Sequence, residues 1–219
     1  MIVCRFDIGA YRTLVFDCDG VLLNSNMIKT EAFFISALPY GEENAKLLVD
    51  YHVHNGGISR YKKFEYLLRQ ILGKPNYNRS ELAKLLRTYR GEVVNRLLLC
   101  EVEPGLEALR EKTKASRWFV VSGGDQDELR YVFKKRGLDY LFDGGIFGSP
   151  DTKEQILERH IAAYTNQNLI DTVYLGDSQY DYEVAEKFGI DFIFVKGWSE
   201  SKFSFDEAKC VVSRISDLI

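Results

Sequence analysis

The chain has 219 residues, of which 46% are hydrophobic and 28% charged, and its formal net charge is −3. This length suits one ordinary domain with a smaller second one and allows a sizeable core. The charge balance gives no basic surface for nucleic acid, and no apolar run is long enough to span a bilayer, so neither partner is expected. The four cysteines form no Cys-x-x-Cys pair, and without a signal peptide we expect reduced thiols in the cytoplasm.

The first hundred residues begin with strand patterns and continue with helical ones. A short strand is predicted over 2–8 and a buried strand over 12–17, before a sharp turn at Gly20. The helical periodicity that follows covers residues 27–38, 42–54, 58–72 and 78–99, the last opening with a capping box of Asn78 and Glu81. Because no strand interrupts these helices, residues 26–100 are predicted to form a small all-helical unit.

From Pro104 onward, helices alternate with strands. Strands are predicted at 118–122, 145–149, 172–175, 192–195 and 211–212, and helices at 106–113, 125–136, 152–164, 180–188 and near the C-terminus. Such alternation is typical of a mostly parallel sheet covered on both faces. The predicted fold class is therefore α/β, with a Rossmann-like core domain of residues 1–25 and 101–219 and an inserted all-helical cap domain of residues 26–100.

The strand over 12–17 ends in two carboxylates. Asp17 and Asp19 follow the apolar run Leu14-Val15-Phe16 directly, with Cys18 between them. Carboxylates are costly to bury without a partner, so this strand end calls for a cation, a proton or a substrate. Alternation along the strand points Cys18 to the opposite side, so we expect it to pack in the core.

Three other predicted strands also lead to polar groups. Ser122 is followed by Gly123 and a second glycine, the next strand leads to Lys153, and Asp177 and Asp181 follow the fourth. Since the carboxyl ends of parallel strands share one edge, where ligands bind in open α/β sheets, these groups are expected to converge.

The converging groups suit phosphoryl transfer. A phosphate monoester repels a carboxylate, and a Mg²⁺ ion held by Asp17 and Asp177 would offset that repulsion. Lys153, Ser122 and the amides around Gly123 would stabilise the charge on the transferred group. Asp17 would then be the nucleophile that forms an aspartyl-phosphate.

These residues resemble the motifs of a known family. Asp17-Cys-Asp-Gly-Val resembles the first motif of the haloacid dehalogenase (HAD) superfamily, Asp-x-Asp-Gly-(Thr/Val). Ser122-Gly-Gly, Lys153 and Gly-Asp177-Ser-x-x-Asp181 resemble its second, third and fourth motifs, in the expected order. The helical insert resembles the cap of the phosphoglycolate phosphatase and β-phosphoglucomutase branch.

The resemblance implies a Mg²⁺-dependent phosphatase of a small phosphorylated metabolite. Asp17 would be the nucleophile and Asp19 the general acid and base. Mg²⁺ would be held by Asp17, the backbone carbonyl of Asp19 and Asp177, with Asp181 as a further ligand or a partner of one. The phosphoryl group would be bound by Ser122, Gly123 and Lys153.

The cap carries one further candidate. His54-Asn-Gly-Gly-Ile-Ser-Arg60 looks like the specificity loop of capped relatives, where β-phosphoglucomutase has a similar Gly-Val-Ser-Arg. Arg60 is therefore expected to hold a second phosphate or carboxylate of the substrate bidentately, with help from Lys63. His54 is a more remote candidate.

Other functions stay open. In β-phosphoglucomutase a histidine follows the nucleophile by twelve residues, and Lys29 in this place disfavours the phosphomutase alternative without excluding it. Asp19 argues against a dehalogenase, whereas a phosphonatase would need a cap lysine such as Lys29, Lys62 or Lys63. A phosphoaspartate signalling domain lacks such an insert, and a non-enzymatic binding protein is disfavoured because the catalytic set is complete.

Overall fold

The core of the molecule is one parallel sheet. The computed structural model describes residues 7–166, 168–202 and 208–219. Six strands pair in the order β3-β2-β1-β4-β5-β6, and all of the pairs are parallel. Their bounds are Thr13–Phe16 (β1), Arg117–Asp125 (β2), Gly145–Ser149 (β3), Thr172–Gly176 (β4), Asp191–Val195 (β5) and Cys210–Val212 (β6). The predicted α/β fold with a parallel sheet is confirmed.

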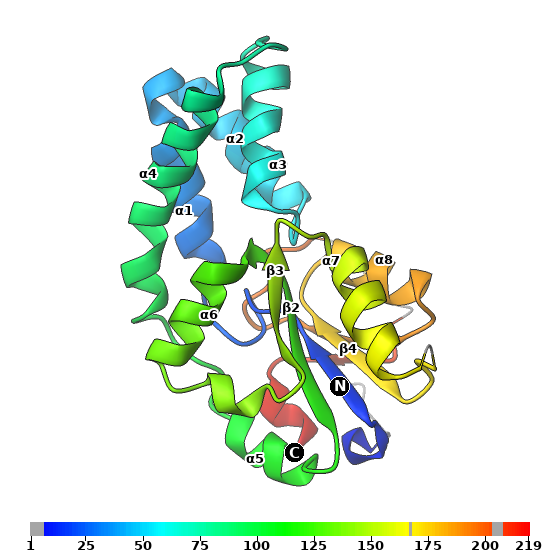
Figure 1. Ribbon diagram of the computed structural model, residues 1–219. Helices are drawn as coiled ribbons and strands as arrows, with labels where there is room; N and C mark the ends of the chain where they lie inside the picture. Colours follow the sequence, from blue (N-terminus) through cyan, green and yellow to red (C-terminus); the bar gives the residue numbers. More distant parts are fainter. Residues whose placement is uncertain (1–6, 167, 203–207) are drawn as a thin grey trace.

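Helices cover both faces of the sheet (Figure 1). Leu14 and Phe16 of β1 pack in one core cluster with α5 (Leu106–Lys112) and α6 (Gln126–Lys135). Val15 points into the other, with α7 (Lys153–Ile156), its π-helical continuation (Leu157–Ala162) and α8 (Gln179–Lys187). A strand buried on both faces is continuously apolar. The apolar run before Asp17 therefore places this carboxylate at the centre of the molecule.

Four helices stand beyond the carboxyl ends of the strands (Figure 1). They are α1 (Asn26–Ala37), α2 (Glu42–His54), α3 (Arg60–Tyr66) with a π-helical continuation (Leu67–Ile71), and α4 (Arg79–Leu97). The predicted capping box at Asn78 opens α4. Phe33, Phe64 and Tyr89 pack their rings together inside this unit. The division into domains at residues 25/26 and 100/101 stays a prediction.

Two chain segments connect the helical unit to the sheet, and they are bonded to each other. The amide of Asn24 donates to the carbonyl of Glu101 (2.9 Å), and that of Glu103 donates to the carbonyl of Leu22 (3.0 Å). Leu23 forms an antiparallel bridge with Val102. The outgoing and returning segments therefore form one short two-stranded connection.

Some expectations differ from the structure. Ile8–Ala10 forms a 3-10 helix, so the strand predicted over 2–8 is wrong at Ile8, and residues 2–6 lie outside the described residues. Cys18 and Cys100 carry free thiols, but Cys210 is disulfide-bonded, so the expectation of reduced thiols is wrong there. Cys18 packs in the core as predicted. Among the described helices, none has the length and apolar character that crossing a membrane requires.

Gly20 makes the turn that follows β1. Its φ is +76°, which favours glycine, and a Cβ built there would lie 2.1 Å from Oδ2 of Asp177 and 2.5 Å from Nδ2 of Asn26. Gly73 has a similar φ of +63° but no neighbouring atom within 4 Å of a built Cβ. Both glycines therefore need a positive φ, but only Gly20 also lacks room for a side chain.

We expect Gly20→Ala to lower the free energy of unfolding by about 3 kcal/mol, because it adds overpacking to backbone strain. Gly73→Ala meets only the backbone strain and should cost about 1 kcal/mol. Denaturant unfolding of both variants measures the difference. Equal losses would show that the space beside Asp177 is not restrictive.

Candidate active site

Asp17 lies at the end of β1 and is 3% exposed. Its amide donates to the carbonyl of Leu175 (2.9 Å), which extends the ladder with β4 and holds the residue in place. Nζ of Lys153 lies 2.9 Å from its Oδ1. Burial raises the pKa of Asp17 to about 7, because Lys153 only partly offsets the desolvation and the nearby carboxylates of Asp181 and Asp19 raise it further.

Lys153 is fixed between two carboxylates. It is the first residue of α7, which opens with a capping box of Thr152 and Gln155. Its Nζ also binds Oδ1 of Asp181 at 2.5 Å. Burial alone would lower the pKa of Lys153, but Asp17 and Asp181 raise it well above its usual value. Lys153 is therefore a fully buried ammonium beside the candidate nucleophile.

Asp181 has both carboxylate oxygens occupied. Its Oδ1 accepts from Lys153, and its Oδ2 accepts from the backbone amide (3.1 Å) and hydroxyl (2.6 Å) of Ser178. Ser178 caps α8, and Asp181 closes the capping box in the first turn. Asp181 is thus held by Ser178 and in turn holds the ammonium of Lys153 in place.

Asp177 follows β4 and faces the same space. Its Oδ2 accepts from Nδ2 of Asn26, at the start of α1 (2.7 Å), and the hydroxyl of Ser199 donates to its backbone carbonyl (2.5 Å). Burial, followed by the charges of Asp17 and Asp181, raises its pKa well above the usual range. A proton or a cation is required to neutralise this carboxyl group.

The carboxylates fit a divalent cation. One oxygen each of Asp17, Asp177 and Asp181 lies within 4.8 Å of the others. The ammonium of Lys153 pairs with both Asp17 (2.9 Å) and Asp181 (2.5 Å), so the negative charge of the three carboxylates exceeds the positive charge beside them. Buried hard oxygen ligands with an unmet electrostatic need suit Mg²⁺. Asp17 and Asp177 are the residues best placed to hold it, since Asp181 is already bonded on both oxygens.

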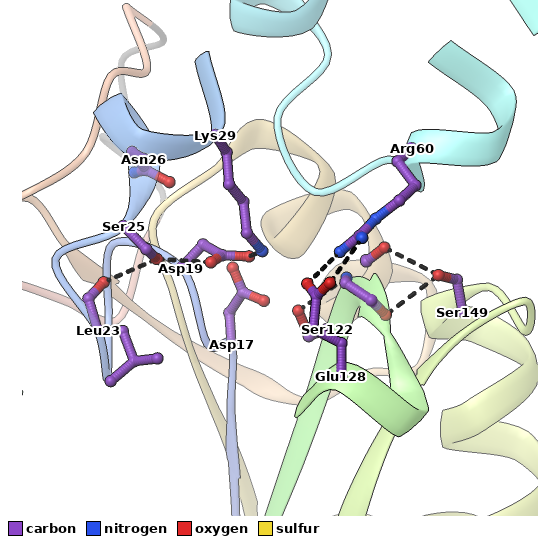
Figure 2. A network of polar contacts seen from close by, with 12 residues as sticks. Asp17, Asp19, Leu23, Ser25, Asn26, Lys29, Arg60, Ser122, Glu128 and Ser149 are labelled. Carbon is purple, nitrogen blue, oxygen red and sulfur yellow. Dashed lines mark hydrogen bonds and ion pairs between the residues drawn. The ribbon is translucent and has the colours of Figure 1, made fainter. Parts of the chain in front are cut away.

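Asp19 has different partners from Asp17 (Figure 2). Its Oδ1 accepts from the hydroxyl of Ser25 (2.6 Å), and its Oδ2 binds Nζ of Lys29, which is 7% exposed. Burial raises the pKa of Asp19, but Lys29 and Ser25 outweigh that effect and lower it. The surroundings thus raise the pKa of Asp17 and lower the pKa of Asp19, so that Lys29 favours the ionised form of Asp19.

The loop after β2 lies directly under the cap. Ser122 is fully buried, and its hydroxyl accepts from the amide of Gly124 (3.0 Å). A Cβ built on Gly123 would lie 2.0 Å from the carbonyl oxygen of Gly57, in the loop before α3. Only a residue without a side chain lets the two backbones come this close. The cap loop therefore covers the predicted phosphate-binding loop.

A cavity of about 420 Å³ lies between the cap and the strand ends. Asp17, Asp19 and Asp177 line it from the sheet side, and Gly123 lies beside them. From the cap, the lining includes Lys29, His52, His54, Arg60, Lys63 and Tyr89. Ser122, Lys153 and Asp181 are buried close by, at 1% exposure or less. Asp17, Asp19, Asp177, Gly123 and Arg60 of the predicted site thus line one cavity, whereas Ser122, Lys153 and Asp181 are not among its lining residues.

Arg60 differs from the expectation in its partner. Both of its terminal nitrogens bind the carboxylate of Glu128 in α6, at 2.9 and 2.5 Å. Lys63 contacts Nδ1 of His52 (2.6 Å), and burial, followed by the charge of Lys29, lowers its pKa to about 7. That Arg60 binds a second anion of the substrate stays a prediction. In the structure, its positive charge is already compensated by Glu128.

Several site residues were not anticipated from the sequence. They are Ser25, Asn26, His52 and Glu128, together with the pairing of Lys29 with Asp19. Glu128 has a local signal as the third residue after the cap Asp125, and its amide does donate to Asp125 (3.1 Å). Its carboxylate, however, turns to Arg60, which is 68 residues away in the chain.

Known structures share this fold at low sequence identity. A predicted phosphoglycolate phosphatase from Haemophilus somnus is 16% identical, with 95% of this chain and 96% of that chain covered and a TM-score of 0.72. A β-phosphoglucomutase from Clostridium difficile is 17% identical (95% and 93% covered, TM-score 0.74). CbbY from Rhodobacter sphaeroides, in complex with phosphate, is 16% identical (95% and 96% covered, TM-score 0.71). Among curated proteins no match is found.

The amino-acid sequence also matches the model of a protein family. The model described as haloacid dehalogenase-like hydrolase matches residues 11–189, a span that contains all four strand-end motifs and the whole helical insert. The resemblance that these motifs indicated is thereby confirmed. The chain is a member of the haloacid dehalogenase-like hydrolase family.

Proposed function

We propose that the protein is a Mg²⁺-dependent phosphatase that hydrolyses a small phosphorylated metabolite through an aspartyl-phosphate on Asp17. One observation carries this proposal: the buried carboxylate of Asp17 lies 2.9 Å from the buried ammonium of Lys153 and lines the cavity between the helical unit and the strand ends. Neighbouring structures support it, because one is named as a predicted phosphoglycolate phosphatase and another holds phosphate.

The proposed reaction has two displacements at phosphorus. A carboxylate oxygen of Asp17 attacks, and the bond from phosphorus to the leaving oxygen breaks. Asp19, which must first take up a proton from solvent, gives this proton to the leaving oxygen. Water then attacks the aspartyl-phosphate, Asp19 takes its proton, and the bond from phosphorus to Asp17 breaks. Lys153, the hydroxyl of Ser122 and the amide of Gly123 would bind the phosphoryl oxygens during both steps.

Mg²⁺ would be held by Asp17, Asp177 and the backbone carbonyl of Asp19. When bound, it supplies positive charge that offsets the repulsion between a carboxylate and a phosphate dianion. Asp181 would act by holding Lys153, since both of its oxygens already accept hydrogen bonds. The pairing of Asp19 with Lys29 keeps Asp19 ionised in the free protein, which suits its role as the base in the second step. To act as the acid in the first step, Asp19 must take up a proton before the leaving oxygen departs.

Mg²⁺ should stabilise the folded protein more at pH 8 than at pH 5.5. The pKa of Asp17 is raised to about 7 and that of Asp177 is also raised, so protons compete with the metal as the pH falls. The melting temperature with and without Mg²⁺ at both pH values, at matched ionic strength, measures this. An equal shift at both pH values, or a full shift in Asp177→Asn, would contradict the assignment.

Asp17→Asn should lower phosphatase activity by about 1,000-fold or more, because an amide is a poor nucleophile. The assay uses Mg²⁺ with an aryl phosphate, sugar phosphates, phosphoglycolate and nucleotides. Asp139→Asn, which alters an exposed aspartate far from the site in the fold, is the matched control and should keep its activity. Activity that survives in Asp17→Asn, or after chelation of the metal, would refute the mechanism.

A phosphomutase is the second candidate. The loop that ends at Arg60 lies against Gly123, and a β-phosphoglucomutase is among the similar structures. Lys29 instead of a histidine disfavours this reaction. We expect ³¹P spectra of a sugar 1-phosphate incubated with the protein to show free phosphate. An isomeric sugar phosphate as the main product would make the mutase the correct assignment.

A further inference from the structure

Arg60 and Glu128 form a buried ion pair between the cap and the sheet domain (Figure 2). Arg60 is 6% exposed and Glu128 is 2% exposed. Nη1 donates to Oε2 at 2.9 Å and Nη2 donates to Oε1 at 2.5 Å, which is the bidentate geometry of a strong charge-assisted pair. The guanidinium also lies 4.6 Å from the centre of the Tyr89 ring. A carboxylate of the chain thus occupies the position opposite Arg60.

A ligand anion cannot take this position cheaply. Displacing Glu128 would leave its carboxylate buried in the first turn of α6 without its cation, and uncompensated buried charges are strongly unfavourable. Arg60 nevertheless lines the cavity, so its charge would attract a substrate anion if Glu128 were neutral. The charge of Glu128 therefore determines whether Arg60 presents an uncompensated positive charge to a ligand.

The other buried cations that line the cavity from the cap are also neutralised. Lys29 is paired with Asp19. Lys63 has a pKa lowered to about 7 by burial and by the charge of Lys29, and its amine contacts the imidazole of His52. Near neutral pH, a substantial fraction of Lys63 is therefore uncharged.

The remaining charged residues of the lining do not reverse this balance. Glu183 and Glu200 are acidic, and Lys202 is exposed to solvent, where its charge is screened. Among the described residues, the buried part of the cavity away from Lys153 thus holds no positive charge that lacks compensation. A second anion on the substrate would find little to bind there.

We propose that Glu128 fills the anion position opposite Arg60 from within the chain, so that the site selects phosphate monoesters whose leaving group carries no second negative charge. Glu128 is then a specificity-determining residue. This inference rests on the proposed phosphatase function, since it names the class of leaving group. It replaces a second-anion role for Arg60 with a role in excluding such substrates.

The test compares two probes that cannot be hydrolysed, 3-phosphonopropionate and 3-hydroxypropylphosphonate, by titration calorimetry with Mg²⁺. The wild-type protein should bind the alcohol at least as tightly as the carboxylate. Glu128→Gln keeps the shape of the side chain and leaves the charge of Arg60 uncompensated. It should bind the carboxylate probe about 10-fold tighter than the wild type does, with the alcohol changed by less than about twofold.

Tyr61→Phe is the matched control for a loosened cap. Its hydroxyl donates to Asp125 (2.7 Å), so the substitution removes the neighbouring contact between cap and sheet domain without touching Arg60. The wild-type ratio of the two affinities should persist in this variant. An unchanged ratio in Glu128→Gln, or an equal change in Tyr61→Phe, would overturn the proposal.

Two further readouts keep the outcomes distinct. A wild-type preference for the carboxylate probe would overturn the proposal even if Glu128→Gln failed to fold. Hydrolysis of an aryl phosphate by the same wild-type preparation tests the proposed function separately. Hydrolysis without the shift in ratio refutes the role of Glu128 alone, whereas the shift without hydrolysis refutes the phosphatase and leaves the charge argument standing.

Discussion

Compensation of buried carboxylates is the constraint on which this site depends. Asp17, Asp177 and Asp181 meet at the end of a sheet that is apolar on both faces, where burial leaves them poorly solvated. Lys153 neutralises part of that charge, and the rest raises the pKa of Asp17 and Asp177. The residual negative charge suits a divalent cation, and under the proposed function this cation would in turn attract the phosphate.

The same principle extends to the cap. Among the buried cations that the described helices bring to the cavity, Lys29 is paired with Asp19, Arg60 is paired with Glu128, and Lys63 has a lowered pKa. Buried ion pairs contribute little net stability to the fold. We therefore relate these pairs to which ligands the cavity can bind. Under the proposed function, the side of the cavity at the strand ends would hold the charged phosphoryl group, whereas the side lined by Arg60 and Lys63 is close to neutral.

Local signals in the sequence predicted most of the fold and the sheet side of the site. Capping boxes at Asn78 and Thr152 marked where helices begin, and polar groups after apolar runs marked the strand ends that meet. The pairing of Arg60 with Glu128 was beyond such reasoning. It depends on how a helix of the insert docks on a helix of the sheet domain, and neither residue signals its partner locally. The strand expected near the N-terminus failed at Ile8, where Asp7 caps a 3-10 turn instead.

The hydrogen-bonded connection between the two parts has a consequence for motion. Residues 22–24 and 101–103 are tied to each other, so the helical unit is suspended from a single pivot and not from two independent tethers. A body on one pivot rotates as a whole, and the approach of Gly57 to Gly123 must be released together with the contacts at Arg60. Under the proposed function, these contacts would have to open for the product to leave, so the residues proposed to select the substrate would also affect the rate of turnover.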